Sequence, residues 1–269
     1  QIAYYVWAYA QLLQRGDIAM GEKINYVVPT GNFGNILAAY YAKRMGLPVG
    51  KLICASNRNN VLTDFFRRGE YSLQREFYKT MSPSMDILIS SNLERLLFEL
   101  TNRDEAAVRA MMAQLKATGR YDIGETARSG LEADFWADWC GEDETKAAIR
   151  RTFEQTGYLA DTHTGVALGV SEKYKAMGDT AQTVVVSTAS PYKFPGDVLT
   201  ALDGGETGCG VPEKRSFLGC GSPFGDAKRL SEVTGTAIPR QLAELEGSPV
   251  RHTAVTDIPG MAEAVLQVL

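Results

Sequence analysis

Residues 27–35, with the sequence VVPTGNFGN, constrain the fold of this chain more than any other segment. The apolar, β-branched residues before the turn predict a short strand over residues 24–28. An alanine-rich helix is expected directly after the turn, over residues 36–45. A strand that turns at once into a helix directs several backbone N–H groups and the positive end of the helix toward one point. The segment therefore predicts an anion site at the carboxyl end of a strand.

The pattern of this turn narrows the kind of anion that it suits. A Walker loop has a Lys-Ser/Thr pair after its last glycine, and Asn35 stands at that place here. A dinucleotide-binding loop has three glycines, whereas this turn has only Gly31 and Gly34. The turn thus suits a compact monophosphate without a metal. Its spacing is equally compatible with an empty turn in which Asn32 or Asn35 caps the helix.

Two further strands with polar loops indicate a parallel α/β sheet. Residues 52–55 predict a second buried strand, which runs into the polar loop 56–60. Residues 183–186 predict a third buried strand, which runs into the turn 187–191. Helices between parallel strands cover both faces of such a sheet, in three layers. The loops at the carboxyl ends meet at one edge, so we expect residues 30–35, 56–60 and 187–191 to converge there.

The middle of the chain has a different pattern. Apolar residues at helical spacing predict helices over residues 93–100, 105–117 and 145–155, with a less regular one over 128–140. We therefore expect a mostly helical lobe over residues 61–154, inserted into an α/β core formed by residues 1–60 and 155–269. The aromatic residues Phe135, Trp136 and Trp139 are expected to pack in the core or at the lobe interface. Residues 204–225 fit no element, and residues 253–269 are compatible with a closing turn and helix.

Composition excludes several classes of function. The formal net charge of −4 over 269 residues argues against a general nucleic-acid-binding surface. No apolar run approaches the roughly 18 residues that a membrane span needs. Two histidines and four widely spaced cysteines do not suit a zinc site, so free thiols in a cytoplasmic protein are the simplest interpretation. The cysteines are Cys54, Cys140, Cys209 and Cys220.

Two side chains outside the first turn are candidates for chemistry. His163 lies in the segment DTHTG (residues 161–165), just before a helix expected over residues 166–177. A helix N-terminus disfavours the charged form of a histidine. Thr188 follows the third predicted strand, where its hydroxyl would be fixed at the sheet edge. A structural histidine and an ordinary turn hydroxyl explain these residues as well.

Three segments together resemble the threonine synthases, which are pyridoxal 5'-phosphate enzymes of the tryptophan-synthase β-like fold (fold type II). TGNFGN at residues 30–35 is similar to the phosphate loop of that family. DTHTGVA at residues 161–167 and STASPYKF at residues 187–194 resemble two further motifs, in the order and rough spacing of the family. The resemblance covers the chain up to about residue 200.

The resemblance implies a cofactor site. It assigns the cofactor phosphate to Gly31, Asn32, Phe33, Gly34 and Asn35, largely through backbone N–H groups. It places Thr188 beside the pyridine nitrogen, where a hydroxyl donates to a neutral ring nitrogen. It places His163 and Thr164 near the active-site cleft without a defined step. It also implies that the parent enzyme converts O-phosphohomoserine and water into threonine and phosphate, by γ-elimination and β-hydration.

The lysine that binds the cofactor as a Schiff base has no counterpart here. In the family it precedes the phosphate loop, and neither Lys23 nor Lys43 stands in its position. Lys193 belongs to the third motif. The chain also begins within a helical pattern over residues 1–14, without a capping residue. We therefore expect a C-terminal portion that lacks its N-terminal domain and is inactive alone. Its expected partners are that missing domain and the small-molecule substrate O-phosphohomoserine.

Two alternatives stay open. The chain is compatible with another fold type II lyase, such as a threonine dehydratase or a cysteine-synthase-like enzyme. It is also compatible with a non-catalytic relative that binds phosphate or a partner protein.

Overall fold

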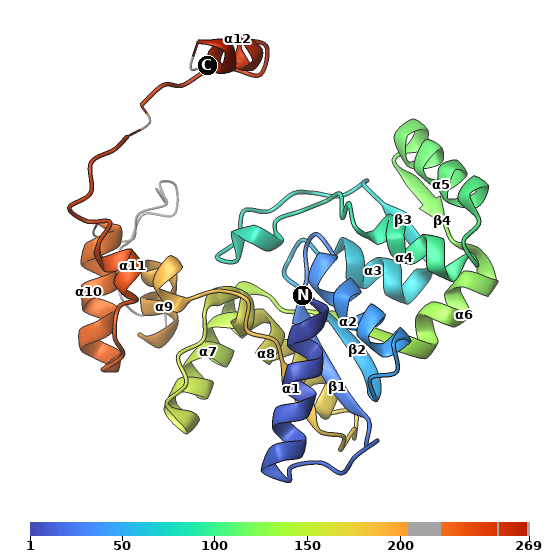
Figure 1. Ribbon diagram of the computed structural model, residues 1–269, viewed down its shortest axis with the longest axis horizontal. Helices are drawn as coiled ribbons and strands as arrows, with labels where there is room; N and C mark the ends of the chain where they lie inside the picture. Colours follow the sequence, from blue (N-terminus) through green and yellow to red (C-terminus); the bar gives the residue numbers. More distant parts are fainter. Residues whose placement is uncertain (204–221, 252, 268–269) are drawn as a thin grey trace.

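A parallel sheet forms the centre of the molecule in the computed structural model, which describes residues 1–203, 222–251 and 253–267 (Figure 1). Its strands lie in the order β5-β2-β1-β6, and every neighbouring pair is parallel. The strands are β1 (Ile24–Pro29), β2 (Val49–Ser56), β5 (Phe135–Trp139) and β6 (Thr183–Val185). The predicted α/β class with a parallel sheet is confirmed.

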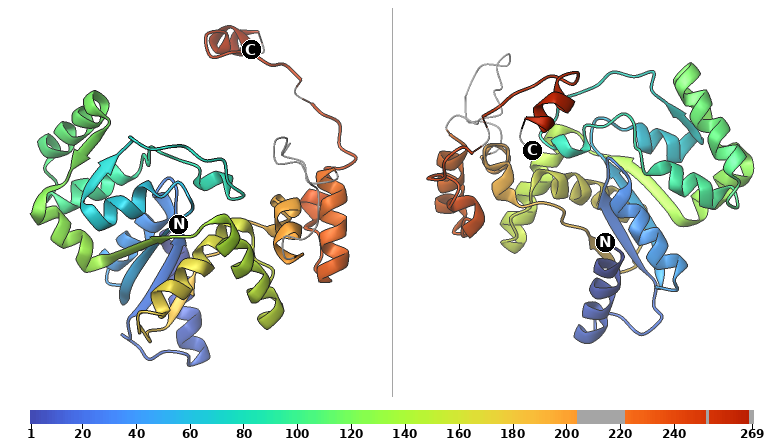
Figure 2. Two further views of the ribbon diagram at one scale, coloured as in Figure 1. Left: turned by 180° about the vertical axis from the view of Figure 1, so that it is seen from behind. Right: turned by 45° about the horizontal axis from the view of Figure 1, so that its top comes forward.

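Alternation of side chains along the strands explains the layers. Val28 and Leu52 belong to the core beneath helix α2 (Gly34–Arg44), whereas their neighbours Val27 and Ile53 pack with helix α8 (Thr162–Lys175). Successive residues of a strand point to opposite faces, so both faces of this sheet are apolar and both must be covered. Figures 1 and 2 show α2 and α8 on opposite sides of the sheet, which gives the predicted three layers.

The remaining elements surround these layers. Helix α1 (Ile2–Arg15) ends at Gly16 in a left-handed conformation, as its sequence indicates. The other helices are α3 (Val61–Arg68), α4 (Leu93–Leu100), α5 (Glu105–Thr118), α6 (Gly124–Asp134), α7 (Glu142–Thr156), α9 (Pro195–Leu202), α10 (Pro223–Thr234), α11 (Arg240–Ala243) and α12 (Met261–Leu266). Strands β3 (Glu70–Ser72) and β4 (Arg120–Asp122) form a small antiparallel pair, and η1 (Pro83–Met85) and η2 (Pro191–Lys193) are single 3₁₀ turns.

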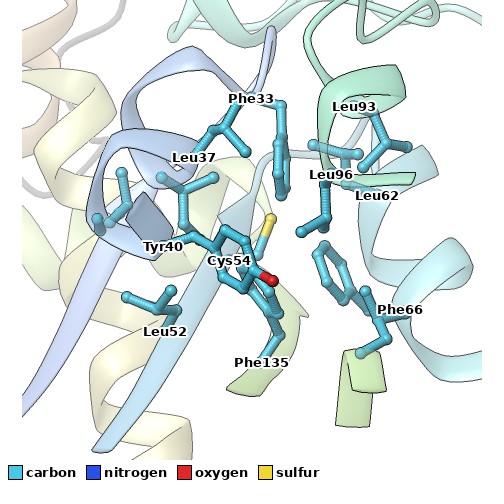
Figure 3. Packing of buried hydrophobic residues seen from close by; sticks show 14 of the residues in the cluster. Phe33, Leu37, Tyr40, Leu52, Cys54, Leu62, Phe66, Leu93, Leu96 and Phe135 are labelled. Carbon is cyan, nitrogen blue, oxygen red and sulfur yellow. The ribbon is translucent and has the colours of Figure 1, made fainter. Parts of the chain in front are cut away.

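The turn after β1 is anchored in the core by its aromatic residue. Phe33 has a φ of 65° and is 1% exposed. Figure 3 shows its ring pointing down among the buried side chains. Its centroid lies 5.9 Å from that of Phe66 and 6.1 Å from that of Phe135. Phe33 thus fixes the turn through its side chain, and Phe135 packs in the core as expected.

The prediction of a helix over residues 128–140 is wrong for residues 135–139. α6 ends at Asp134, and residues 135–139 form β5, whose Trp136 stands opposite Ile53 of β2. Phe135 packs on the α2 side of the sheet, while Trp136 contacts Tyr174 of α8 at 5.0 Å between ring centroids. This alternation has the period of a strand. The division into a core and a lobe over residues 61–154 stays a prediction, and β5 from within that range lies in the main sheet.

Three other expectations are corrected or limited by the structure. β6 was expected to be buried, but its residues are half-buried because, among the described residues, only β1 pairs with it. α8 begins at Thr162 instead of residue 166, because Asp161 caps it. The closing helix is limited to α12, which Figure 1 shows apart from the rest. Cys209, Cys220 and His252 lie outside the described residues.

No helix in the described parts of the chain is long and apolar enough to cross a membrane.

Candidate anion-binding active site

A cavity of about 370 Å³ opens at the carboxyl ends of β1 and β6. The turn after β1 forms one wall, and the loop after β6 together with the start of α8 forms another. The lining residues are Gln1, Pro29, Thr30, Gly31, Asn32, Phe33, Gly34, Asn35, Ser84, Met85, Asn92, His163, Thr188, Ala189 and Lys193. The structure therefore brings the three predicted motifs to one site.

Backbone N–H groups of the turn, whose residues 31–35 line the cavity, have no protein acceptor among the described residues. The first amide of α2 that bonds back to the turn is that of Leu37, which donates to the carbonyl oxygen of Phe33 at 3.1 Å. Within the described chain, no acceptor is found for the amides of residues 31–35. Unpaired amides at a helix N-terminus attract an anion. Neither Asn32 nor Asn35 caps α2, so the cap in that alternative is wrong.

Hydrogen bonds to Asn32 and Gly31 brace the turn instead. Asn32 Oδ1 accepts a hydrogen bond from the Ser91 hydroxyl at 2.6 Å, and the Asn32 carbonyl oxygen accepts one from the Asn92 side chain at 2.8 Å. The Ser90 hydroxyl donates to the Gly31 carbonyl oxygen at 2.7 Å. These bonds come from the segment before α4, so the turn is held by a part of the chain 59 or more residues away.

Gly31 is required by a close approach of two backbones. A Cβ atom at this position would lie 3.0 Å from both the Cα of Met85 and the carbonyl oxygen of Ser84. Such distances are too short for an ordinary carbon contact. The 3₁₀ turn η1 therefore lies directly against the turn of residues 31–35 (the phosphate-type turn), and a side chain at position 31 would force one of the two backbones to shift.

His163 lies at the junction of α8 and η1. It is 3% exposed, and its Nε2 atom accepts a hydrogen bond from the Ser84 amide at 3.2 Å. Its Nδ1 atom lies 3.1 Å from Asp161 Oδ1. An Nε2 that accepts carries no proton, so Nδ1 holds the proton and donates it to Asp161. The histidine lines the cavity, yet both of its ring nitrogens are already used by the protein.

Asp161 organises the start of α8. It is fully buried and caps the helix, with Oδ1 accepting from the amides of His163 at 2.8 Å and Thr164 at 3.3 Å. The Thr164 hydroxyl donates to Oδ2. Burial by itself would raise the pKa of Asp161, but the hydrogen bonds from His163 and Thr164 outweigh it and lower the pKa below its usual value. Thr164 is 2% exposed and does not line the cavity, unlike His163.

The loop after β6 supplies two exposed polar side chains to the cavity. Thr188 follows the strand as predicted, and Lys193 lies at the end of η2. The Nζ atom of Lys193 is 5.5 Å from the centroid of the Phe194 ring. No carboxylate is found among the described residues that line the cavity. Lys43 points elsewhere and pairs with Asp134 at 2.8 Å.

The loop 56–60 does not line the cavity, contrary to expectation. Asn57 and Asn59 donate instead to Asp86 Oδ1 at 2.8 and 2.9 Å, and Asp86 Oδ2 accepts from the Thr80 amide at 2.8 Å. The loop thereby holds the segment that carries Ser84 into the site. Sequence reasoning missed Ser84, Met85 and Asn92, because no local pattern marks residues that reach the site only through tertiary packing.

Comparisons with known proteins agree with this geometry. No family model matches the chain. The chain is 44% identical over 203 residues to threonine synthase-like 1 of Macaca fascicularis, covering 75% of this chain and 27% of that protein. It is 36% identical over 219 residues to the threonine synthase of Saccharomyces cerevisiae, covering 76% of this chain and 42% of the relative. The crystal structure of PLP-bound threonine synthase from Brucella melitensis matches with a TM-score of 0.69 and 41% identity, covering 80% of this chain and 44% of the other.

The chain thus spans less than half of the length of these relatives, whereas they match most of it. Sequence identity well above 30% and a similar fold coincide with the three motifs that meet at the cavity. Over the matched three quarters of its length, the chain is similar in sequence and fold to the threonine synthases.

Proposed function

We propose that the cavity binds pyridoxal 5'-phosphate, with the cofactor phosphate on the amides of residues 31–35. The unpaired amides of this turn are the observation that carries the proposal. Gly31 and Gly34 both line the cavity, and glycine allows a backbone to approach a phosphate closely. The absence of a carboxylate from the described lining also suits an anionic ligand, because no like charge opposes it.

Thr188 is the residue proposed to face the pyridine nitrogen. It lines the same cavity as the turn, from the opposite wall at the end of β6. Its hydroxyl can donate a hydrogen bond to a neutral ring nitrogen. When bound, the cofactor supplies an electron sink for reactions at the carbons of an amino-acid substrate. The chain's own residues bind the phosphate, orient the ring and keep the ring nitrogen unprotonated.

The proposed reaction of the whole enzyme is the conversion of O-phosphohomoserine and water into threonine and phosphate. The proton transfers in such a reaction need a basic side chain at the cofactor. His163 does not suit that role, because Asp161 and Ser84 occupy both of its nitrogens. We propose that a lysine outside this sequence takes the role, and that the chain alone does not turn over. A cytoplasmic location stays a prediction.

Cofactor binding can be tested on the chain alone. Titration with pyridoxal 5'-phosphate, followed by tryptophan fluorescence, is expected to show saturable binding, whereas pyridoxal without its phosphate binds at least tenfold more weakly. Equal affinity for the two compounds would show that the turn is not a phosphate site.

The reaction is tested by reconstitution. A longer polypeptide that supplies the portion preceding this chain in its relatives is expected to release phosphate from O-phosphohomoserine, while the chain alone releases none. A reconstituted protein that binds the cofactor but releases no phosphate would favour the non-catalytic alternative. Release of ammonia from threonine would instead favour a dehydratase.

A further inference from the structure

Asp161 connects the two opposite walls of the cavity without lining it. Its carboxylate is 0% exposed, and its hydrogen bonds run in two directions. One direction leads through His163 to η1, and the other leads through Thr164 to the loop after β6. An isolated buried carboxylate is unfavourable, so a position of this kind depends on the bonds that it receives.

The first branch ends at the proposed phosphate site. Asp161 holds the proton on His163 Nδ1, which leaves Nε2 as an acceptor for the Ser84 amide at 3.2 Å. The backbone of Ser84 lies against Gly31, where an added Cβ would be 3.0 Å from the Ser84 carbonyl oxygen. A shift of the His163 ring therefore moves the backbone that packs on the phosphate turn.

The second branch ends beside Thr188. The Thr164 hydroxyl donates to Asp161 Oδ2, and Thr164 Oγ1 also lies 3.3 Å from the Ser187 hydroxyl. Ser187 accepts a further hydrogen bond from the Tyr158 hydroxyl at 3.0 Å. Because Ser187 precedes Thr188 directly in the chain, this branch fixes the start of the loop that would meet the pyridine nitrogen.

We propose that Asp161 is a positioning residue that sets the phosphate end and the ring-nitrogen end of the cavity relative to each other. The proposal rests on the proposed cofactor site. A carboxylate suits this role because all four groups that face it are donors: the amides of His163 and Thr164, the imidazole Nδ1 and the Thr164 hydroxyl. His163 is the titratable side chain among them. An asparagine would present an NH₂ group to some of these donors.

A first experiment tests the connection without any ligand. In ¹⁵N NMR spectra, His163 is expected to show a protonated Nδ1 and an unprotonated Nε2. The spectrum of a His163→Leu variant identifies its resonances, because the chain has only two histidines. Asp161→Asn is expected to mix the two tautomers and to shift the amide signals of both Ser84 and Thr188. An unchanged tautomer, or a shift at one wall only, would overturn the proposal.

A second experiment compares pyridoxal 5'-phosphate, which would contact both ends of the cavity, with inorganic phosphate, which would contact only the phosphate end. Thr164→Val removes the hydroxyl of the second branch and is expected to weaken pyridoxal 5'-phosphate binding roughly fivefold, the effect of one lost hydrogen bond, while inorganic phosphate binds as before. Thr164→Ser keeps the hydroxyl and is expected to restore the affinity. His163→Leu is expected to weaken both ligands, because it releases Ser84 from the phosphate turn.

Thr145→Val is the matched control for these variants. Thr145 is also a buried threonine in a neighbouring helix, and its hydroxyl donates to the Gly141 carbonyl oxygen at 2.8 Å instead of to Asp161. The Thr145→Val variant should bind pyridoxal 5'-phosphate and inorganic phosphate as tightly as the unaltered chain. If Thr164→Val weakens both ligands equally, or neither, Asp161 does not set the two ends. If the unaltered chain binds neither ligand, the proposed function fails, and the NMR result still decides whether Asp161 joins the walls.

Discussion

The hydroxyl of Tyr5 donates a hydrogen bond to Asn35 Oδ1 at 2.8 Å and lies 3.0 Å from the Asn35 carbonyl oxygen. Helix α1 is thereby joined to the last residue of the phosphate-type turn. Tyr5 itself is buried, with its ring edge-on to that of Tyr26 at 5.0 Å between centroids. The first helix of the chain is therefore part of the support of the site.

Tyr5→Phe is expected to lower the free energy of unfolding by about 1 kcal/mol, because the hydroxyl bond is lost while the ring packing stays. Affinity for pyridoxal 5'-phosphate should fall a few-fold, since Asn35 loses its anchor. Urea unfolding and ligand titration measure the two effects. Tyr4→Phe is the control, because Tyr4 is 70% exposed and should change neither. Equal effects of the two substitutions would contradict the role of the hydroxyl.

Gly31→Ala is expected to destabilise the protein by about 1–3 kcal/mol, as for an overpacked core, because the new methyl group meets the backbone of Ser84 and Met85. The same substitution should reduce phosphate affinity, since η1 or the turn must move. Gly247→Ala is the control, because a Cβ there meets nothing within 4 Å. A stable Gly31→Ala variant with unchanged phosphate affinity would show that the turn tolerates the shift and does not bind the ligand.

Gly169→Ala is expected to loosen the contact between α8 and Cys140, which follows β5. Its Cβ would lie 2.5 Å from Cys140 Sγ but 3.6 Å from Cys140 Cβ. Gly169→Ala alone should lower the free energy of unfolding by about 1–3 kcal/mol. The double variant Cys140→Ala/Gly169→Ala lacks the sulfur and should therefore recover most of this loss. Urea unfolding of the two single variants and the double variant measures this coupling. Strictly additive losses would show that the sulfur is not the obstacle.

The lowered pKa of Asp161 predicts an acid-sensitive contribution to stability. A carboxylate whose pKa is lower in the folded protein than in the unfolded chain, where it is about 3.9, stabilises the fold above that value. The contribution decreases as the pH falls through the folded-state pKa, because the carboxylate is then protonated in both states. The difference in unfolding free energy between the unaltered chain and Asp161→Asn should therefore shrink from pH 6 toward pH 3. If this difference in unfolding free energy stayed constant with pH, the pKa of Asp161 would not be lowered in the folded protein.

Two cysteines are expected to resist alkylation in the folded protein. Burial raises the pKa of Cys54 to about 12 and that of Cys140 to about 11, and hydrogen bonds from neighbouring side chains reduce these shifts only in part. The reactive thiolate is therefore absent near pH 8, and access is closed as well. Iodoacetamide labelling followed by peptide mass spectrometry should modify both residues only after denaturation. Labelling of either one in the native protein at the unfolded rate would contradict the burial.

Part of the site could be predicted from short stretches of the sequence. The strand-turn-helix order around Gly31 follows from the preferences of a few consecutive residues. The cap at Asp161 was missed, since the sequence predicts the start of that helix at residue 166. The order of three motifs sufficed to predict that Thr188 and His163 would meet the turn. The assignment of residues 135–139 failed, because five residues with two tryptophans are ambiguous until pairing with β2 decides their period.

The sequence by itself determined the α/β class, the phosphate-type turn and the residues of its motifs, because backbone preferences and side-chain periodicity act over a few neighbouring positions. Only the tertiary structure decided that Ser84, 79 residues from His163, would occupy Nε2 of that histidine. It also decided that residues 57–59 would hold Asp86 instead of lining the cavity. Such contacts depend on how distant segments pack against each other, and no local preference specifies them.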